Sequence, residues 1–130
     1  MIVTINDENT KWDAELLLHG TFVDLCALCG FLVDWSKNPR AIAFSSLDFV
    51  ELRNLPDVML VDARMASNIM ADSHECVLML DPDGAEDFAR KVKSVCEHPG
   101  PAHTYLDTCN GVTLLVSKEE YGDLGQKEGL

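Results

Sequence analysis

The chain has 130 residues, enough for one domain with a hydrophobic core but too few for two domains of ordinary size. Hydrophobic residues make up 47% and charged residues 25%, which is typical of globular proteins and unlike disordered or membrane-embedded chains. The 22 acidic and 10 basic residues give a net charge of −12, which argues against nucleic acid and anionic membranes as partners. A partner that uses this charge is basic; alternatively, the charge only confers solubility.

The location of the protein follows from its first residues and its cysteines. The start, MIVTINDENTKWD, lacks the basic segment of a secretory signal and turns polar within six residues. No apolar run reaches the length of a membrane span. Five cysteines, an odd number without a dense framework, indicate free thiols in a reducing compartment. We therefore expect a cytoplasmic protein.

Hydrophobic periodicity and turn residues divide the chain into strands and two helices. In chain order they predict strands over 1–5 and 11–20, a helix over 22–35, strands over 41–47, 58–65 and 76–80, a helix over 83–98, and strands over 102–108 and 112–118. Thr21 is the expected cap of the first helix, and Asp83 with Glu86 the expected capping box of the second. The first two and the last two strands should form hairpins.

The two halves of the chain share this order of elements, which predicts an internal repeat. Two β-α-β-β units are expected at about 12–65 and 75–118. Aligning their helices pairs residues of one apolar stripe: Leu25 with Phe88, Cys29 with Val92, and Leu32 with Val95. The sequence thus predicts a single α+β domain over 1–118, with a mostly antiparallel sheet, two helices on one face, and a flexible acidic tail over 119–130.

Cys26 and Cys29 form a C-x-x-C, which is common in redox centres and in halves of zinc sites. A redox pair normally lies at a helix N-terminus, where the dipole lowers the thiol pKa. This pair falls in the second turn of an apolar helix, where desolvation raises a thiol pKa, and the alignment places Cys29 in the core. A zinc site also needs two further ligands, and no second C-x-x-C exists. We therefore expect structural thiols.

A second group of metal-ligand residue types follows the second helix: Cys96, His98, His103 and Cys109. Their spacing does not match a paired-ligand zinc signature, and Cys96 belongs to the helix stripe. Motifs of serine hydrolases, phosphate-binding loops and zinc proteases are absent from the sequence. We expect no metal, no cofactor and no enzymatic activity. The alternative that stays open is a small metal- or ligand-binding protein or enzyme using His98, His103 and Cys109.

Acidic residues concentrate in residues 41–89, which hold ten acids and two bases, or −8 of the net charge of −12. Much of this segment is predicted loop, where binding residues tend to lie. The candidate partner-binding residues are its loop acids, Asp48, Glu51, Asp57, Asp72 and Glu75. Helix capping accounts for Asp83 and Glu86 instead. A solvated acidic surface without a partner is the simpler alternative.

The second half, CVLMLDPDGAEDFARKVKSVCEHPGPAHTYLDT followed by GVTLLVSK, resembles bacterial immunity proteins of polymorphic toxin systems, including contact-dependent inhibition. The shared pattern is a strand, an acidic turn, an amphipathic helix and a strand opening with histidine. The first half departs from this pattern in its apolar helix. Such proteins are small, acidic, cytoplasmic α+β proteins that block one toxin domain, often a basic nuclease. The resemblance implies a non-enzymatic inhibitor and assigns no residue a role.

Overall fold

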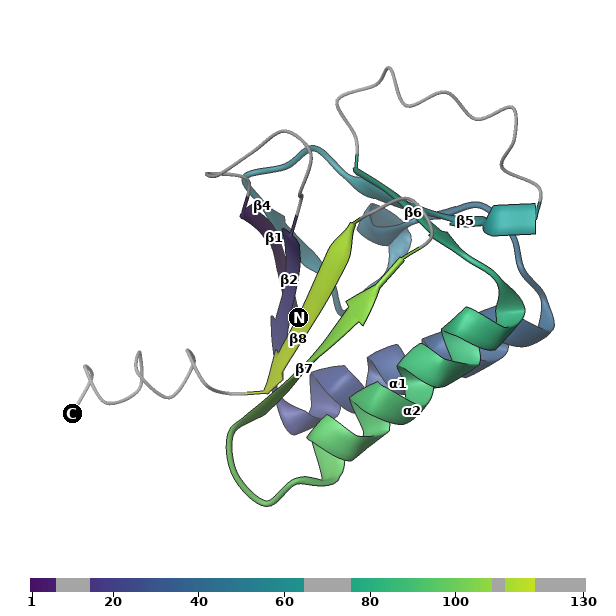
Figure 1. The fold of residues 1–130 in the computed structure, drawn as a ribbon. Coiled ribbons are helices and arrows are strands. Elements are labelled where there is room, and N and C mark those ends of the chain that lie inside the picture. The colour runs from purple at the N-terminus through teal and green to yellow at the C-terminus, as the bar shows by residue number, and fades with distance from the viewer. Residues whose placement is uncertain (7–14, 65–75, 109–111, 119–130) are drawn as a thin grey trace.

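The computed structural model describes residues 1–6, 15–64, 76–108 and 112–118, which form two α-helices and two mixed β-sheets (Figure 1). In chain order the elements are β1 (Ile2–Asn6), β2 (Glu15–Gly20), α1 (Phe22–Lys37), β3 (Ile42–Ala43), the 3-10 turn η1 (Phe44–Ser46), β4 (Glu51–Arg53), β5 (Val58–Asp62), β6 (Cys76–Leu80), α2 (Pro82–Glu97), β7 (Ala102–Asp107) and β8 (Thr113–Lys118). The predicted α+β class is confirmed. The predicted tail over 119–130 lies outside the described residues, as does the segment 65–75.

The strands differ from the single, mostly antiparallel sheet that the sequence predicts. They form a five-stranded sheet of order β4-β1-β2-β8-β7 and a three-stranded sheet of order β3-β5-β6. The pairs β1–β2, β7–β8 and β3–β5 are antiparallel, whereas β1–β4, β2–β8 and β5–β6 are parallel. β4 is a strand that the sequence does not predict, and the strand predicted over 41–47 is limited to Ile42–Ala43, followed by the turn η1.

An exchange of strands between the two halves of the chain explains the two sheets. β2 of the first half pairs in parallel with β8, and β6 of the second half pairs in parallel with β5. Each half therefore adds its first strand to the hairpin of the other half. The two parallel pairs have the same register. Gly20, directly before the cap of α1, lies opposite Lys118 at the end of β8, and Leu80, directly before the cap of α2, lies opposite Asp62 at the end of β5.

Both helices have 16 residues and a side-chain cap at the N-terminus. The Thr21 hydroxyl accepts from the Asp24 amide, and the Asp24 carboxylate accepts from the Thr21 amide, so the predicted Thr21 cap is confirmed as a capping box. α2 is instead capped by Asp81, which accepts from the Gly84 amide at 2.6 Å, with Pro82 in the first turn. The predicted cap at Asp83 is therefore wrong by two residues.

The helices bury equivalent positions when their caps, Thr21 and Asp81, are aligned. α1 buries Leu25, Leu28, Leu32 and Trp35, and α2 buries Ala85, Phe88, Ala89, Val92, Val95 and Cys96. Leu28 thus corresponds to Phe88, and the sequence alignment that paired Leu25 with Phe88 is shifted by three residues. A shift of three keeps apolar residues on one helical stripe, so periodicity alone cannot detect it. The predicted burial of the α2 stripe is confirmed.

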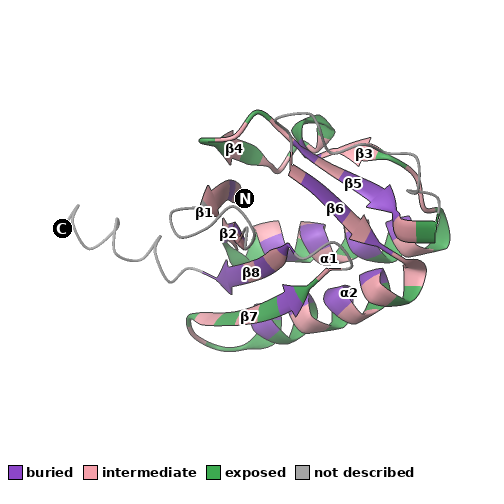
Figure 2. Ribbon diagram, turned by 45° about the horizontal axis from the view of Figure 1, so that its top comes forward, coloured by how far each residue is buried: buried purple, intermediate pink, exposed green. Residues whose placement is uncertain are grey.

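Both helices pack against the same side of the two sheets and enclose one core (Figures 1 and 2). Its residues come from the inner faces of the strands, including Leu16 and Val116 in the larger sheet and Leu60 and Leu78 in the smaller one. Within the described residues, neither helix is long and apolar enough to span a membrane. The fold leaves the outer face of α2 in contact with solvent.

Candidate partner-binding surface

The structure places three of the five predicted binding acids between η1 and β5, whereas Asp72 and Glu75 lie outside the described residues. Asp48 is exposed in the turn that follows η1. Glu51 is exposed at the start of β4, and its carboxylate pairs with Arg53 at 2.7 Å. Asp57 is half-buried directly before β5. These three acids do not form one cluster of free carboxylates.

Asp57 has a structural function that its sequence position does not reveal. Its carboxylate accepts from the Ser45 hydroxyl at 2.6 Å, the Ser45 amide at 3.1 Å and the Val58 amide at 2.8 Å. Partial burial alone raises the pKa of Asp57, but the hydrogen bonds from Ser45 and Val58 outweigh it and lower the pKa. The carboxylate therefore fastens η1 to the start of β5.

Asp57→Asn should lower the free energy of unfolding by about 1 kcal/mol at neutral pH, because an amide cannot accept all three bonds. The pKa of Asp57 is lower in the folded than in the unfolded chain. Its contribution is therefore present above the unfolded pKa, about 3.9, and is lost as the pH falls through the lowered folded value. Urea denaturation between pH 7 and pH 3 should show the two proteins converge in acid. The exposed Asp48→Asn is the control; a constant difference for Asp57→Asn would contradict the assignment.

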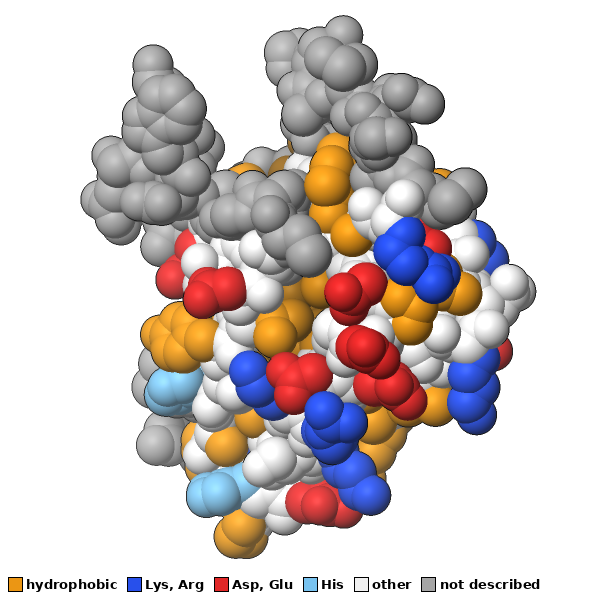
Figure 3. Space-filling view, turned by 45° about the vertical axis from the view of Figure 1, so that its right-hand side comes forward, with side chains coloured by type: hydrophobic (Ala, Val, Ile, Leu, Met, Phe, Trp, Pro, Cys, Tyr) orange, Lys and Arg blue, Asp and Glu red, His pale blue; other side chains and the backbone are white. Residues whose placement is uncertain are grey.

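A second group of acids lies where β6 leads into α2, and we name Asp62, Asp81, Asp83 and Glu86 the α2 acidic patch. Asp83 and Glu86 are exposed, and within the described part of the chain neither makes an ion pair or a side-chain hydrogen bond. Asp81 already caps the helix, so these two carboxylates are free of that role. Figure 3 shows acidic side chains gathered on this face beside a band of basic ones.

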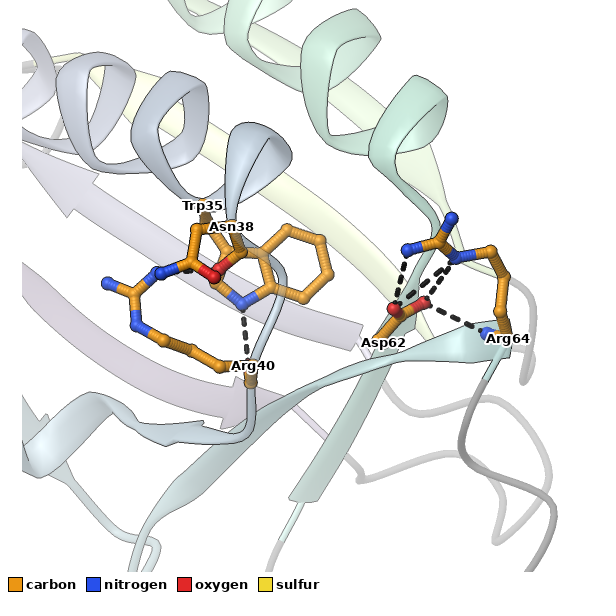
Figure 4. A network of polar contacts seen from close by, with 5 residues as sticks. All are labelled: Trp35, Asn38, Arg40, Asp62 and Arg64. Atoms are coloured by element: carbon orange, nitrogen blue, oxygen red, sulfur yellow. Dashed lines mark hydrogen bonds and ion pairs between the residues drawn. The ribbon is translucent and has the colours of Figure 1, made fainter.

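Arg64 is the base that lies within this patch. Its guanidinium pairs with Asp62 at 2.8 Å and also donates from Nε at 3.1 Å (Figure 4). This hydrogen-bonded contact with Asp62, followed by the charges of Asp62, Asp81 and Asp83, raises the pKa of Arg64. Four carboxylates and one guanidinium give the α2 acidic patch a charge of −3. Asp62 of this patch ends β5 and Asp57 directly precedes β5, so the two residues lie about 17 Å apart at the spacing of an extended strand.

Sequence reasoning missed the patch because it assigned Asp83 and Glu86 to helix capping. The signal that identifies the true cap is the Asp81-Pro82 pair, since proline favours the first helical position and aspartate the position before it. The next acid along the helix, Asp87, is paired with Arg90 at 3.2 Å and Lys91 at 3.5 Å. The patch therefore ends where the basic band of α2 begins.

The alternative site around His98 and His103 is a shallow pocket of about 220 Å³ between α2 and β7. Gly100 donates its amide to Nδ1 of His98, and the His103 ring packs edge-on against Tyr105. Cys109 lies outside the described residues. Among the residues that the structure describes, no group of three or more potential ligands is placed to hold a metal ion.

Metal analysis of the purified protein tests this alternative. We expect less than about one tenth of an equivalent of zinc by mass spectrometry, because a structural zinc ion requires four protein ligands. Stoichiometric zinc that is lost in the double variant His98→Ala/His103→Ala would contradict this expectation.

Comparisons with family models, with curated proteins and with solved structures identify no match to this chain. The chemistry of the described surface therefore supplies the functional argument. Its most distinctive feature is two exposed carboxylates, Asp83 and Glu86, beside an ion pair between the buried Asp62 and the exposed Arg64.

Proposed function

We propose that this chain is a non-enzymatic, cytoplasmic binding protein that neutralises a basic protein, namely a toxin domain of the nuclease class. The observation that carries the proposal is the α2 acidic patch, where Asp83 and Glu86 expose carboxylates that make no ion pair within the described part of the chain. The resemblance of the second half to bacterial immunity proteins supports the same class of partner. Three of the four acids of the patch, Asp81, Asp83 and Glu86, lie within that half of the chain.

The charge of the patch suits a surface that binds phosphates. A nuclease must present cationic side chains where it binds nucleic acid. Carboxylates on a rigid helix can bind these same side chains in place of the phosphates. Complementary charge also accelerates encounter, which matters for an inhibitor that must act before its target does damage. The 16-residue α2, packed along its length on the core, holds these carboxylates in fixed positions.

The loop acids have unequal parts in this proposal. Asp48 is exposed and free to contact a partner, whereas Glu51 is partly neutralised by Arg53. Asp72 and Glu75, which lie outside the described residues, stay candidates from the sequence alone. Asp57 serves the fold. We therefore assign first contact to the α2 acidic patch and a peripheral role to the loop acids.

Co-expression in a bacterial host tests the proposal. The probe is the most basic domain encoded directly beside the gene for this chain, placed under an inducible promoter. We expect induction of that domain to stop growth and co-expression of this chain to restore it. A chain carrying Asp83→Lys and Glu86→Lys should protect less well than one carrying Asp48→Lys and Glu51→Lys. A basic neighbour that does not inhibit growth, or inhibition that this chain leaves unchanged, would overturn the proposal.

A further inference from the structure

Three cysteines gather where the outer edges of α1 and α2 meet. Cys26 and Cys29 lie on α1, and Cys96 lies near the end of α2. The sulfur atoms of Cys26 and Cys96 are 3.2 Å apart, although 70 residues separate them in the chain. Cys29 lies 3.5 Å from the Ala89 carbonyl, so the two helices run antiparallel. The C-x-x-C therefore faces a third thiol that spacing along the sequence does not reveal.

The two close sulfurs have different access to solvent. Cys26 is exposed, whereas Cys96 is only 5% exposed and also lies 3.5 Å from the Phe22 carbonyl. The expectation that Cys29 lies in the core is only partly right, because Cys29 is half-buried, and Cys26 on the same apolar helix is exposed. A pocket of about 390 Å³ opens beside them, between Val33 and the α2 residues near its end. A small oxidant in water can reach Cys26, with Cys96 directly behind it.

We propose that Cys26 and Cys96 form a reversible redox pair, which a hydroperoxide oxidises to a disulfide joining α1 to α2. The sulfurs must approach by only about 1 Å to reach the length of a disulfide bond. Both residues lie on helices that pack against each other, so the fold itself holds the two sulfurs close together. This inference is independent of the proposed function.

The reaction proceeds in two steps. The Cys26 sulfur, as its thiolate, attacks one oxygen of hydrogen peroxide; the O–O bond breaks, two electrons pass to the peroxide, Cys26 becomes a sulfenic acid, and the hydroxide that leaves is protonated to water. The Cys96 sulfur, as its thiolate, then attacks the Cys26 sulfur, the S–O bond breaks, and hydroxide leaves and is protonated to water. Two thiols and one hydrogen peroxide thus give one disulfide and two waters.

The second step should depend strongly on pH. Burial, together with the neighbouring Cys26 and Cys29 sulfurs, raises the pKa of Cys96 to about 11, while the Lys118 ammonium on β8 opposes this shift. Lys118 also donates to the Cys96 carbonyl at 3.1 Å. Below that pKa the thiolate fraction of Cys96, and with it the rate of disulfide closure, should rise about tenfold for each pH unit.

Peroxide titration of the full-length protein tests the proposal. Wild-type protein should lose two thiols and 2 Da, as measured by alkylation under denaturing conditions and intact mass. Peptide mapping should join the peptides of Cys26 and Cys96, and a dithiol reductant should reverse the bond. The matched control Cys29→Ser should form the same cross-link at a similar rate. Cys26→Ser, at an exposed position that preserves the fold, should form no intramolecular disulfide.

A variant that lacks the second thiol provides an independent measurement. Cys96→Ser should trap the sulfenic acid at Cys26, detected as a dimedone adduct, and Cys96→Ala serves if the serine variant does not fold. A Cys26–Cys29 disulfide as the main product would overturn the proposal. So would unchanged oxidation of Cys26→Ser, or a wild-type protein that retains all its thiols at peroxide concentrations that oxidise glutathione.

Discussion

Trp35→Ala should lower the free energy of unfolding by about 4 kcal/mol, in the range measured for removal of a fully buried tryptophan from a core. Trp35 has no exposed surface and lies in the last turn of α1, against the core. Its indole Nε1 donates to the Arg40 carbonyl at 2.7 Å, and Arg40 in turn donates to the Asn38 carbonyl at 2.8 Å (Figure 4). The substitution therefore removes packing and also releases the turn that leads from α1 to β3.

Urea denaturation monitored by circular dichroism measures this change. The control is Val33→Ala on the same helix, because Val33 is 37% exposed and should cost less than about 1 kcal/mol. A loss below about 1.5 kcal/mol for Trp35→Ala would show that the end of α1 is not anchored as the structure places it.

Reversal of Asp83 and Glu86 to lysine should weaken binding to the basic toxin domain by about 100-fold, or roughly 2.7 kcal/mol. The double variant changes the local charge by four units at a patch whose charge is −3. Exposed charges act mainly on the association rate, so stopped-flow measurements at low salt should show most of the loss. The difference from wild type should shrink as salt screens the charges.

The matched control for this prediction is Asp48→Lys with Glu51→Lys, which makes the same change of net charge between η1 and β5. We expect this control to lose less than about tenfold in affinity. Equal losses in the two variants would indicate that net charge alone steers the partner, and a larger loss in the control would place the contact on the loop acids.

The helices and their buried faces were predictable from the sequence because their signals are local. Thr21 with Asp24 forms a cap within one turn, and Phe88, Val92 and Val95 repeat at helical spacing. The partners of the strands were not predictable in the same way. The alternation of apolar and polar residues fixes which face of a strand is buried, but not which other strand it pairs with. The pairing of β2 with β8, and of β6 with β5, therefore left no local signal in the sequence.

The candidate sites show the same division between local and long-range information. The acid-rich segment was evident from composition. Which of its carboxylates are free was not, because that depends on the identity of the helix cap, which is Asp81. Asp57 looked like a loop acid because its partner Ser45 lies 12 residues away. The contact of Cys26 with Cys96 left no signal in the sequence because the two residues, 70 positions apart, meet only in the folded chain.

We propose that this chain covers the cationic, nucleic-acid-binding site of a basic toxin domain. The most direct test is a competition measurement with purified components: a fluorescently labelled oligonucleotide is bound to a catalytically inactive form of that domain, and this chain is titrated in. The account predicts full displacement of the oligonucleotide, with an apparent Kd for this chain that rises in proportion to oligonucleotide concentration, and weaker displacement by the Asp83→Lys/Glu86→Lys variant. A ternary complex, in which this chain binds while the oligonucleotide stays bound, would contradict it.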